Sequence, residues 1–216
     1  MREFVIVTGM ILKAEPVGEY DRRVVILTGE RGKISAFAKG ARRPGSRLMA
    51  ATSPFSFGEF KLYEGRSAYT VVEAVIRNYF EELREDYVGA YYGMYFMEVA
   101  DYYTRENNDE LQMLKLLYQS LKALLHQKLP DELVQCVFEL KAIAVNGEYP
   151  GIPEGDHFLE STLYAVDYIG KTSIEKLYTF LVSEEVLAEL KGIAAGYRRR
   201  FMDRKFKSLE ILETLC

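Results

Sequence analysis

The stretch "FVIVTGMILKAEPVGEYDRRVVILTGERGKISAFAKG", residues 4–40, decides the fold class of the N-terminal third. It holds three runs of apolar and β-branched residues, at 4–14, 20–29 and 32–40, separated by turn signals. The third run alternates with a period of two: Ile34, Ala36 and Ala38 share one face, and Ser35, Phe37 and Lys39 share the other. The stretch therefore predicts three successive β-strands.

Two more strands are predicted at 55–63, "FSFGEFKLY", and 67–76, "SAYTVVEAVI", joined by the hairpin connection "EGR". Alternation places Phe55, Phe57 and Tyr63 on one face and Phe60 on the other. Five antiparallel strands in so small a unit must close, or nearly close, to hide their edges. We expect a five-stranded OB-fold barrel, with an SH3-like barrel as the alternative.

The pattern changes to helical periodicity near residue 78. Helices are expected at 78–106, 109–127 and 130–147. Their expected boundary signals are Asp109 as a cap, Pro130-Asp131 as a start and Asn146-Gly147 as an end. Further helices are expected at 173–182, 183–205 and 208–215, with Ser173 and Ser183 as N-caps. Residues 157–169 fit either a helix or a small hairpin.

The predicted fold class is therefore α+β with two domains, an OB-fold domain at 1–78 and an α-helical domain at 79–216. The most apolar segment, 87–97, is too short and too rich in tyrosine to span a membrane. The opening "MREFVIVTGMILK" lacks a signal-peptide cleavage site, so we expect a cytoplasmic protein without membrane contact. With two cysteines and two histidines, all far apart, no disulfide framework, metal site or cofactor is expected.

Charge is distributed unevenly along the chain. The formal net charge is -4, yet residues 1–80 carry 13 Lys and Arg against 8 Asp and Glu, and residues 81–216 carry 15 against 24. Within 22–47 there are eight basic residues and one acid, Glu30. A basic patch on an acidic chain is typical of a polyanion binder, although a solvated surface is the simpler alternative.

Motifs of catalysis are missing from the sequence. "LTGERGKI" resembles a phosphate-binding loop, but Leu27 and Ile34 occupy the positions where a Walker A motif needs glycine and Ser/Thr. No metalloprotease motif, nucleophile elbow or Cys-His pair in matching context occurs. We therefore expect a protein that is not an enzyme, with no catalytic residues.

Binding chemistry remains, because Lys and Arg on loops neutralise phosphates and exposed rings stack on bases. The candidate phosphate-binding cations are Arg22, Arg23, Arg31, Lys33, Lys39, Arg42, Arg43, Arg47 and Arg66. The candidate stacking rings are Phe37, Phe57 and Tyr63. A second basic run supplies Arg198, Arg199, Arg200, Arg204 and Lys205, which either bind DNA or an acidic peptide or compensate a helix C-terminus. If the run is one helix, Arg200, Arg204 and Lys207 share a stripe.

The opening of the chain closely resembles that of the RecO family of bacterial DNA repair and recombination mediators. The matching positions are Gly9, Gly18-Glu19-x-Asp21-Arg22, Thr28, Gly32-Lys33, Lys39-Gly40, Arg42, Arg43 and Ser46. "SPFSFGEFKLY", "NYFEELRED", "FELKAIAVNGEYP" and "GYRRRFMDRKFKSLEIL" follow in the expected order. The resemblance is specific in the first 50 residues and weaker in between.

This resemblance implies an N-terminal OB-fold and a helical C-terminal domain. It also implies binding to single- and double-stranded DNA and annealing of complementary strands. The same resemblance implies that the protein acts with RecR to load RecA onto strands coated by single-strand-binding protein, and that it contacts the acidic C-terminal tail of that protein. A bacterial, nucleoid-associated location follows from the same resemblance. A generic OB-fold module for single-stranded DNA or RNA, or a protein-interaction adaptor outside repair, are the alternatives.

One feature departs from the family pattern. Many members carry a four-cysteine zinc module after the third long helix, but residues 148–172 contain no cysteine here. A tetracysteinate site cannot form without thiolates. We expect a cysteine-free replacement of this module and no structural zinc.

Overall fold

The computed structural model describes residues 4–66, 68–153 and 157–215, and it divides into two compact units. The barrel unit consists of Met1–Glu81 and Asp101–Leu114, and the helical unit consists of Glu82–Ala100 and Lys115–Cys216. The first division lies close to the expected boundary at residue 78. The barrel unit nevertheless takes a second segment from inside the expected helical domain.

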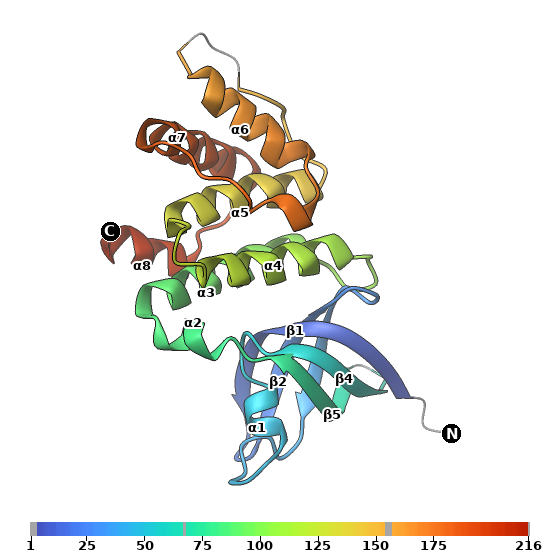
Figure 1. Ribbon diagram of the computed structural model, residues 1–216. Helices are drawn as coiled ribbons and strands as arrows, with labels where there is room; N and C mark the ends of the chain where they lie inside the picture. Colours follow the sequence, from blue (N-terminus) through green and yellow to red (C-terminus); the bar gives the residue numbers. More distant parts are fainter. Residues whose placement is uncertain (1–3, 67, 154–156, 216) are drawn as a thin grey trace. The chain divides into compact units, whose positions relative to one another are not determined.

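Five strands form the barrel: β1 (Phe4–Val17), β2 (Asp21–Thr28), β3 (Lys33–Ala38), β4 (Phe57–Glu64) and β5 (Tyr69–Asn78). They close in the order β1-β2-β3-β5-β4, and β1 pairs with β4 to complete the circle (Figure 1). All pairs are antiparallel except β3 with β5, which is parallel, so the expectation of a wholly antiparallel sheet was wrong at this one pair. The predicted OB-fold barrel is confirmed.

The barrel interior follows the alternation seen in the sequence. The β3 face formed by Ile34, Ala36 and Ala38 is buried, and Phe60 of β4 packs in the same core, whereas Phe57 and Tyr63 are only half-buried. Phe55 departs from the expected pattern, because it precedes β4, has a φ of 71° and is buried. Its backbone N–H donates to the carbonyl oxygen of Ile11 at 3.1 Å.

The second segment of the barrel unit is bound to the β2–β3 turn. The Lys33 N–H donates to the Arg105 carbonyl and the Asn107 N–H donates to the Arg31 carbonyl, each at 3.0 Å. Gly32 has a φ of 65°, and a Cβ at this position would clash with the Arg105 carbonyl oxygen. Glycine is therefore required here both by backbone conformation and by close approach.

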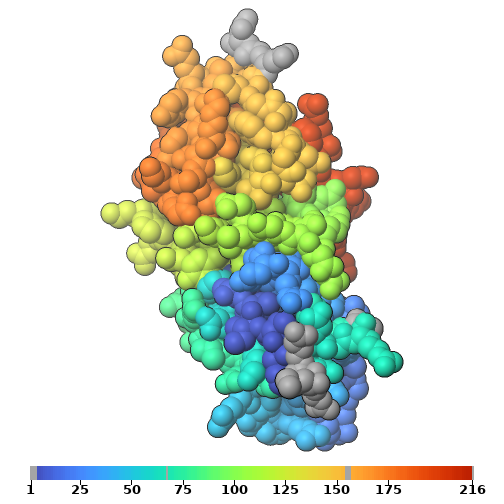
Figure 2. Space-filling model, turned by 90° about the vertical axis from the view of Figure 1, so that its right-hand side faces the viewer, coloured from blue at the N-terminus to red at the C-terminus, as the bar shows by residue number. Residues whose placement is uncertain are grey.

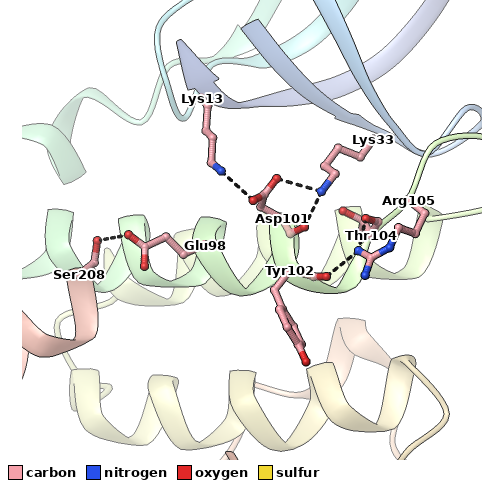
Figure 3. A network of polar contacts seen from close by, with 8 residues as sticks. All are labelled: Lys13, Lys33, Glu98, Asp101, Tyr102, Thr104, Arg105 and Ser208. Carbon is pink, nitrogen blue, oxygen red and sulfur yellow. Dashed lines mark hydrogen bonds and ion pairs between the residues drawn. The ribbon is translucent and has the colours of Figure 1, made fainter. Parts of the chain in front are cut away.

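Asp101 adds side-chain contacts to this attachment. Its carboxylate accepts from Lys13 Nζ at 2.7 Å and from Lys33 Nζ at 3.0 Å, and Lys33 also donates to the Asp101 carbonyl at 2.5 Å (Figure 3). Burial raises the pKa of Asp101, but the hydrogen bonds from the two lysines outweigh it and leave the pKa below its ordinary value. Two barrel strands thus share one anionic anchor.

The remaining elements are helical. They are α1 (Leu48–Ala51) in the β3–β4 connection, α2 (Glu81–Glu85), α3 (Tyr87–Tyr103), α4 (Leu111–Leu124), α5 (Asp131–Val145), α6 (Glu160–Lys171), the 3₁₀ turn η1 (Ile174–Lys176), α7 (Glu184–Phe201) and α8 (Lys207–Leu215). In the helical unit α5 is the central helix and packs against α6 and α7. Its buried residues run along most of its length.

Several helix boundaries match the sequence signals. Asp109 Oδ1 accepts from the Leu111 N–H at 3.1 Å, and Ser183 Oγ accepts from the Val186 N–H at the start of α7. Pro130 precedes α5, and Gly147 follows it with a φ of 80°. These signals are local, so the sequence alone suffices to place them.

Three other expectations were wrong or are now resolved. The ambiguous region 157–169 belongs largely to α6 and not to a hairpin, since its apolar positions recur at helical spacing. The expected helix at 173–182 shrinks to η1, and Ser173 provides no side-chain cap. The expected helix at 183–205 stops at Phe201, and Arg204 and Lys205 lie in the link before α8, so Arg200, Arg204 and Lys207 form no common stripe.

The region expected to replace the zinc module is held by hydrogen bonds. Tyr149 Oη donates to the Val166 carbonyl at 3.0 Å, and Tyr197 Oη donates to the Gly151 carbonyl at 3.0 Å. Lys141 Nζ donates to the carbonyls of Gly170 and Thr172 at 3.0 and 2.6 Å. A tetracysteinate zinc site cannot form here, because this segment contains no cysteine.

A membrane-spanning helix is not found in the described ranges, since none of their helices combines sufficient length with sufficient apolarity.

Candidate nucleic-acid interface

The β3–β4 connection, residues 39–56, gathers at one end of the barrel beside the β1–β2 turn (Figures 1 and 2). The Arg42 N–H donates to the Tyr20 carbonyl at 2.8 Å, and the Gly40 N–H donates to Asp21 Oδ1 at 2.7 Å. Gly40 and Gly45 have φ values of 65° and 77°, which glycine adopts at low cost. The backbone of the basic loop is therefore fixed to the barrel, while its side chains extend outward.

Four predicted cations are exposed, namely Arg23, Lys39, Arg47 and Arg66. Within the described residues no ion pair involves any of them. Arg23 does have an acidic register partner, Glu15 of β1, and both side chains are exposed. These four cations can neutralise phosphates without first breaking an internal ion pair.

Arg42 and Arg43 are exposed and make weak contacts with the β1–β2 turn. Arg42 Nη1 donates to the Gly18 carbonyl at 3.3 Å. The Arg43 guanidinium lies over the Tyr20 ring, 5.1 Å from its centroid. Such contacts orient an arginine and leave most of its donors available for phosphate oxygens.

Three predicted cations form hydrogen bonds or ion pairs with other residues of the barrel unit. Arg22 Nη1 donates to the Met49 carbonyl at 2.6 Å and to the hydroxyls of Thr52 and Ser53, which fixes the short helix α1. Arg31 binds Glu64 and the hydroxyl of Tyr69, and Lys33 binds Asp101. These side chains stabilise the barrel unit and are poorly placed to meet a ligand.

The three predicted stacking rings do not form one surface. Phe37 is 36% exposed and is the cross-strand neighbour of Arg23. Phe37 pairs with Thr70 of β5, and Thr70 pairs with Tyr63 of β4. Tyr63 therefore lies two strands further around the barrel than Phe37. Phe57 lies at the other end of β4, opposite Asn78. Phe37 is therefore the ring that shares a surface with exposed cations.

Tyr20 was missed as a candidate ring. It is 39% exposed in the β1–β2 turn, and Arg43 packs over it. The sequence offered a weak signal, an aromatic residue next to the Gly18-Glu19 turn, but the contact with Arg43 depends on folding. Tyr20 and Phe37 give this end of the barrel two exposed rings among its cations.

The second basic run is divided by the structure. Arg199, Arg200, Arg204 and Lys205 are exposed, but Arg198 is largely buried in the helical unit. Arg198 Nη1 donates to Glu139 Oε1 at 2.8 Å, and Tyr95 Oη donates to the same oxygen at 2.7 Å. Burial and then the charge of Glu139 raise the pKa of Tyr95, so its hydroxyl remains a donor. Arg198 stabilises the fold and does not offer its charge to a ligand.

The geometry suits electrostatic binding better than covalent chemistry. The exposed cations lie on the barrel loops and on β2, as is common for OB-folds that bind oligonucleotides through strands 2–3 and adjacent loops. No group of three or more His, Cys, Asp or Glu residues within the described ranges could hold a metal ion. This site defines a class of protein: an OB-fold barrel with a cationic end, followed in the chain by a helical unit.

Comparison with known proteins specifies that class. A family model described as "Recombination protein O N terminal" matches residues 1–80, and one described as "Recombination protein O C terminal" matches residues 84–154. The chain therefore belongs to the RecO family, as the resemblance of its opening residues predicted.

Relatives along nearly the whole chain agree. The chain is 28% identical to the DNA repair protein RecO of Acetivibrio thermocellus over 241 aligned residues, which cover 96% of each protein. It is 27% identical to that of Clostridium perfringens strain 13, covering 95% of this chain and 96% of the relative. It is 37% identical to the DNA repair protein RecO of Alkaliphilus metalliredigens over a shorter alignment, which covers 66% of this chain and 58% of the relative. A role in DNA repair and recombination follows from this family membership.

Proposed function

We propose that the cationic end of the barrel binds single- and double-stranded DNA and brings complementary strands together for annealing. The observation that carries this proposal is the gathering of five exposed cations at this end of the barrel, with the exposed rings of Tyr20 and Phe37: Arg23, Lys39, Arg42, Arg43 and Arg47. Arg66 is also exposed, but it lies in the β4–β5 connection. The cations bind the phosphate backbone of any sequence, and the rings stack on unpaired bases.

Annealing by this surface requires no covalent step. Two DNA strands repel each other, and a cationic surface lowers that repulsion while raising the local concentration of both strands. Base pairing then supplies the specificity. The proposal therefore names no catalytic residue and no cofactor.

Salt dependence of binding is the first test. If all six exposed cations contact phosphates, the slope of log K against log salt for a single strand is about -4. Fluorescence anisotropy of a labelled oligonucleotide, titrated at several salt concentrations, measures this slope. A slope near zero excludes phosphate binding and leaves a protein-interaction adaptor as the better account.

Substitution at the loop is the second test. Arg42→Ala with Arg43→Ala is expected to reduce the magnitude of the slope by about 1.4 and to slow annealing of complementary oligonucleotides. The matched control, Lys128→Ala with Lys176→Ala, removes the same charge from exposed positions of the helical unit. Equal loss in both variants would show that net charge, not this loop, governs binding.

We further propose that the chain acts with RecR to load RecA onto DNA coated by single-strand-binding protein. Arg199, Arg200, Arg204 and Lys205 are the exposed cations offered to the acidic tail of that protein. Work on chromosomal DNA would place the protein in the bacterial cytoplasm, at the nucleoid. Family membership supports this extension, whereas the barrel geometry supports DNA binding alone.

An annealing assay on strands coated with single-strand-binding protein, with and without its C-terminal tail, tests the extension. Faster annealing that depends on the tail, and that falls when Arg199 and Arg200 become alanine, supports it. Annealing of bare DNA without any effect on coated DNA would instead indicate a generic OB-fold module outside recombination.

A further inference from the structure

A groove in the helical unit lies between α6 and the segment that precedes α7. Its volume is about 920 Å³, within the range of ligand sites, and rings and aliphatic side chains form most of its lining. Tyr164, Tyr168 and Phe180 supply the rings, and Leu181 and Val186 the aliphatic side chains. None of these residues belongs to the cationic end of the barrel or to the second basic run.

Two of the lining side chains are exposed to a degree unusual for large apolar residues. Tyr164 is 72% exposed and Leu181 is 63% exposed. Tyr164 stacks on Tyr168, and Tyr168 meets Phe180 edge to face, so the rings are ordered against one another. An ordered, exposed aromatic surface beside a hollow is typical of a protein-interaction site.

The backbone along one side of the groove has unused hydrogen-bonding capacity. Within the described part of the chain, no hydrogen bond uses the N–H or C=O groups of Phe180, Leu181 or Val182. These three residues have no helical or strand structure. A partner segment running beside them in an extended conformation can pair with these groups and place alternate side chains in the groove.

The charge at one end of the groove selects the partner. Glu160 lines the groove, and Glu184 and Glu185 are exposed next to the lining residues Ser183 and Val186. These acids also suit the first turns of α6 and α7, whose N-terminal dipoles favour negative charge. Lys176, the last residue of η1, is exposed beyond the end of α6, while Lys171 is paired with Asp167 at 2.7 Å. The Glu160 end therefore attracts cations.

We propose that this groove docks an extended segment of a partner protein that carries apolar anchor residues and Lys or Arg beside them. Exposed rings and aliphatic side chains take the anchors, the backbone of 180–182 pairs with the segment, and the carboxylates near Glu160 meet its cations. The charge preference is opposite to that of the basic surfaces, so this partner differs chemically from DNA and from an acidic tail.

The test uses the full chain and two short synthetic peptides with Leu and Phe at alternating positions, one with lysines at both ends and one with glutamates. The lysine peptide is expected to bind with an affinity measurable by anisotropy and to bind less tightly as salt rises. Leu181→Asp with Tyr164→Ala is expected to weaken binding by about tenfold or more, since these exposed anchors should carry much of the contact energy. Glu184→Lys with Glu185→Lys should weaken it by about threefold.

Tyr87→Ala is the matched control, because Tyr87 is 62% exposed on the same unit and lies outside the groove. Thermal unfolding of each variant checks that the fold is retained, which is expected because all substituted side chains are exposed. Annealing of DNA should be unchanged in the groove variants, so failure here and failure of the proposed function can be told apart.

Three outcomes would overturn the proposal. The glutamate peptide could bind as tightly as the lysine peptide, or neither could bind at about 1 mM, a concentration that detects even weak association. The third outcome is a dimer of the chain that Leu181→Asp dissociates, because the occupant of the groove would then be a second copy.

Discussion

The two basic runs have similar composition but different roles in the folded chain. In the barrel unit six of nine predicted cations are exposed and form no ion pair with any residue that the structure describes, because loops and turns carry most of them away from the core. In the helical unit Arg198 lies on the inner side of α7 and neutralises Glu139, while its neighbours Arg199 and Arg200 are exposed. Whether a cation is available to a ligand therefore depends on its place in the fold more than on the number of cations nearby.

The largest expected effect comes from removing the buried cation. Arg198→Ala leaves Glu139 buried without its ion-pair partner and should lower the free energy of unfolding by about 3–5 kcal/mol. Arg199→Ala, at the exposed neighbouring position, should change it by less than about 0.5 kcal/mol. Urea denaturation monitored by circular dichroism measures both. Equal effects would mean that the ion pair contributes nothing specific.

The same contrast exists inside the barrel unit, at adjacent positions of β2. Arg22→Ala removes hydrogen bonds from a charged donor to α1 and should cost about 1–3 kcal/mol of stability. Arg23→Ala should leave stability nearly unchanged and should reduce the magnitude of the DNA-binding salt slope by about 0.7. Denaturation and salt titration on both variants check the pair. Interchanged results would contradict the roles assigned to these two residues.

Acid should loosen the attachment of the second barrel segment. Because the folded pKa of Asp101 is lowered, its contribution to stability is present above its ordinary pKa of about 3.9 and is lost as pH falls through the folded value. The stability difference between the wild type and Asp101→Asn should therefore be largest near neutral pH and shrink below about pH 4. Glu30→Gln, at an exposed position, is the control. A difference independent of pH would argue against the ion pairs.

The smallest expected effect has the opposite sign. Burial, followed by the charges of Asp86 and Glu132, raises the pKa of Asp131 to about 6. A raised carboxyl pKa means that the folded state holds the proton more tightly, so stability falls as pH rises from about 4 to about 6. Asp131→Asn should therefore stabilise the protein at pH 7, by less than about 1 kcal/mol because solvent screens a half-buried group. Destabilisation at pH 7 would show that the favourable effect of a negative charge at the start of α5 outweighs the cost of burying it.

The barrel could be predicted from sequence because the signals for its strands lie within short stretches of the chain. Alternation along β3 assigns Ile34 and Phe37 to opposite faces, and turn signals fix the strand limits. Phe55 could not be assigned in this way, because its positive φ interrupts the period before β4 begins. The helix limits at Ser183 and Gly147 were equally local, whereas the end of α7 at Phe201 lacks a glycine or proline signal.

The candidate site was only partly predictable. Exposed loop cations such as Arg42 followed from composition and turn residues. The role of Arg198 depends on Glu139, 59 positions earlier in the chain, and the role of Lys33 depends on Asp101, 68 positions later. Pairings at such separations leave no periodic pattern, so a single sequence does not predict them.

The discontinuity of the barrel unit has a consequence for synthesis and for truncation. A chain cut after residue 81 has all five strands but lacks Asp101, Arg105 and Asn107, which bind β1, β3 and the β2–β3 turn. During synthesis, the barrel unit is therefore complete only after residue 114 has emerged from the ribosome. A fragment intended to carry DNA binding alone should extend through this segment, because the five strands by themselves leave the lysines of the anchor without their acid.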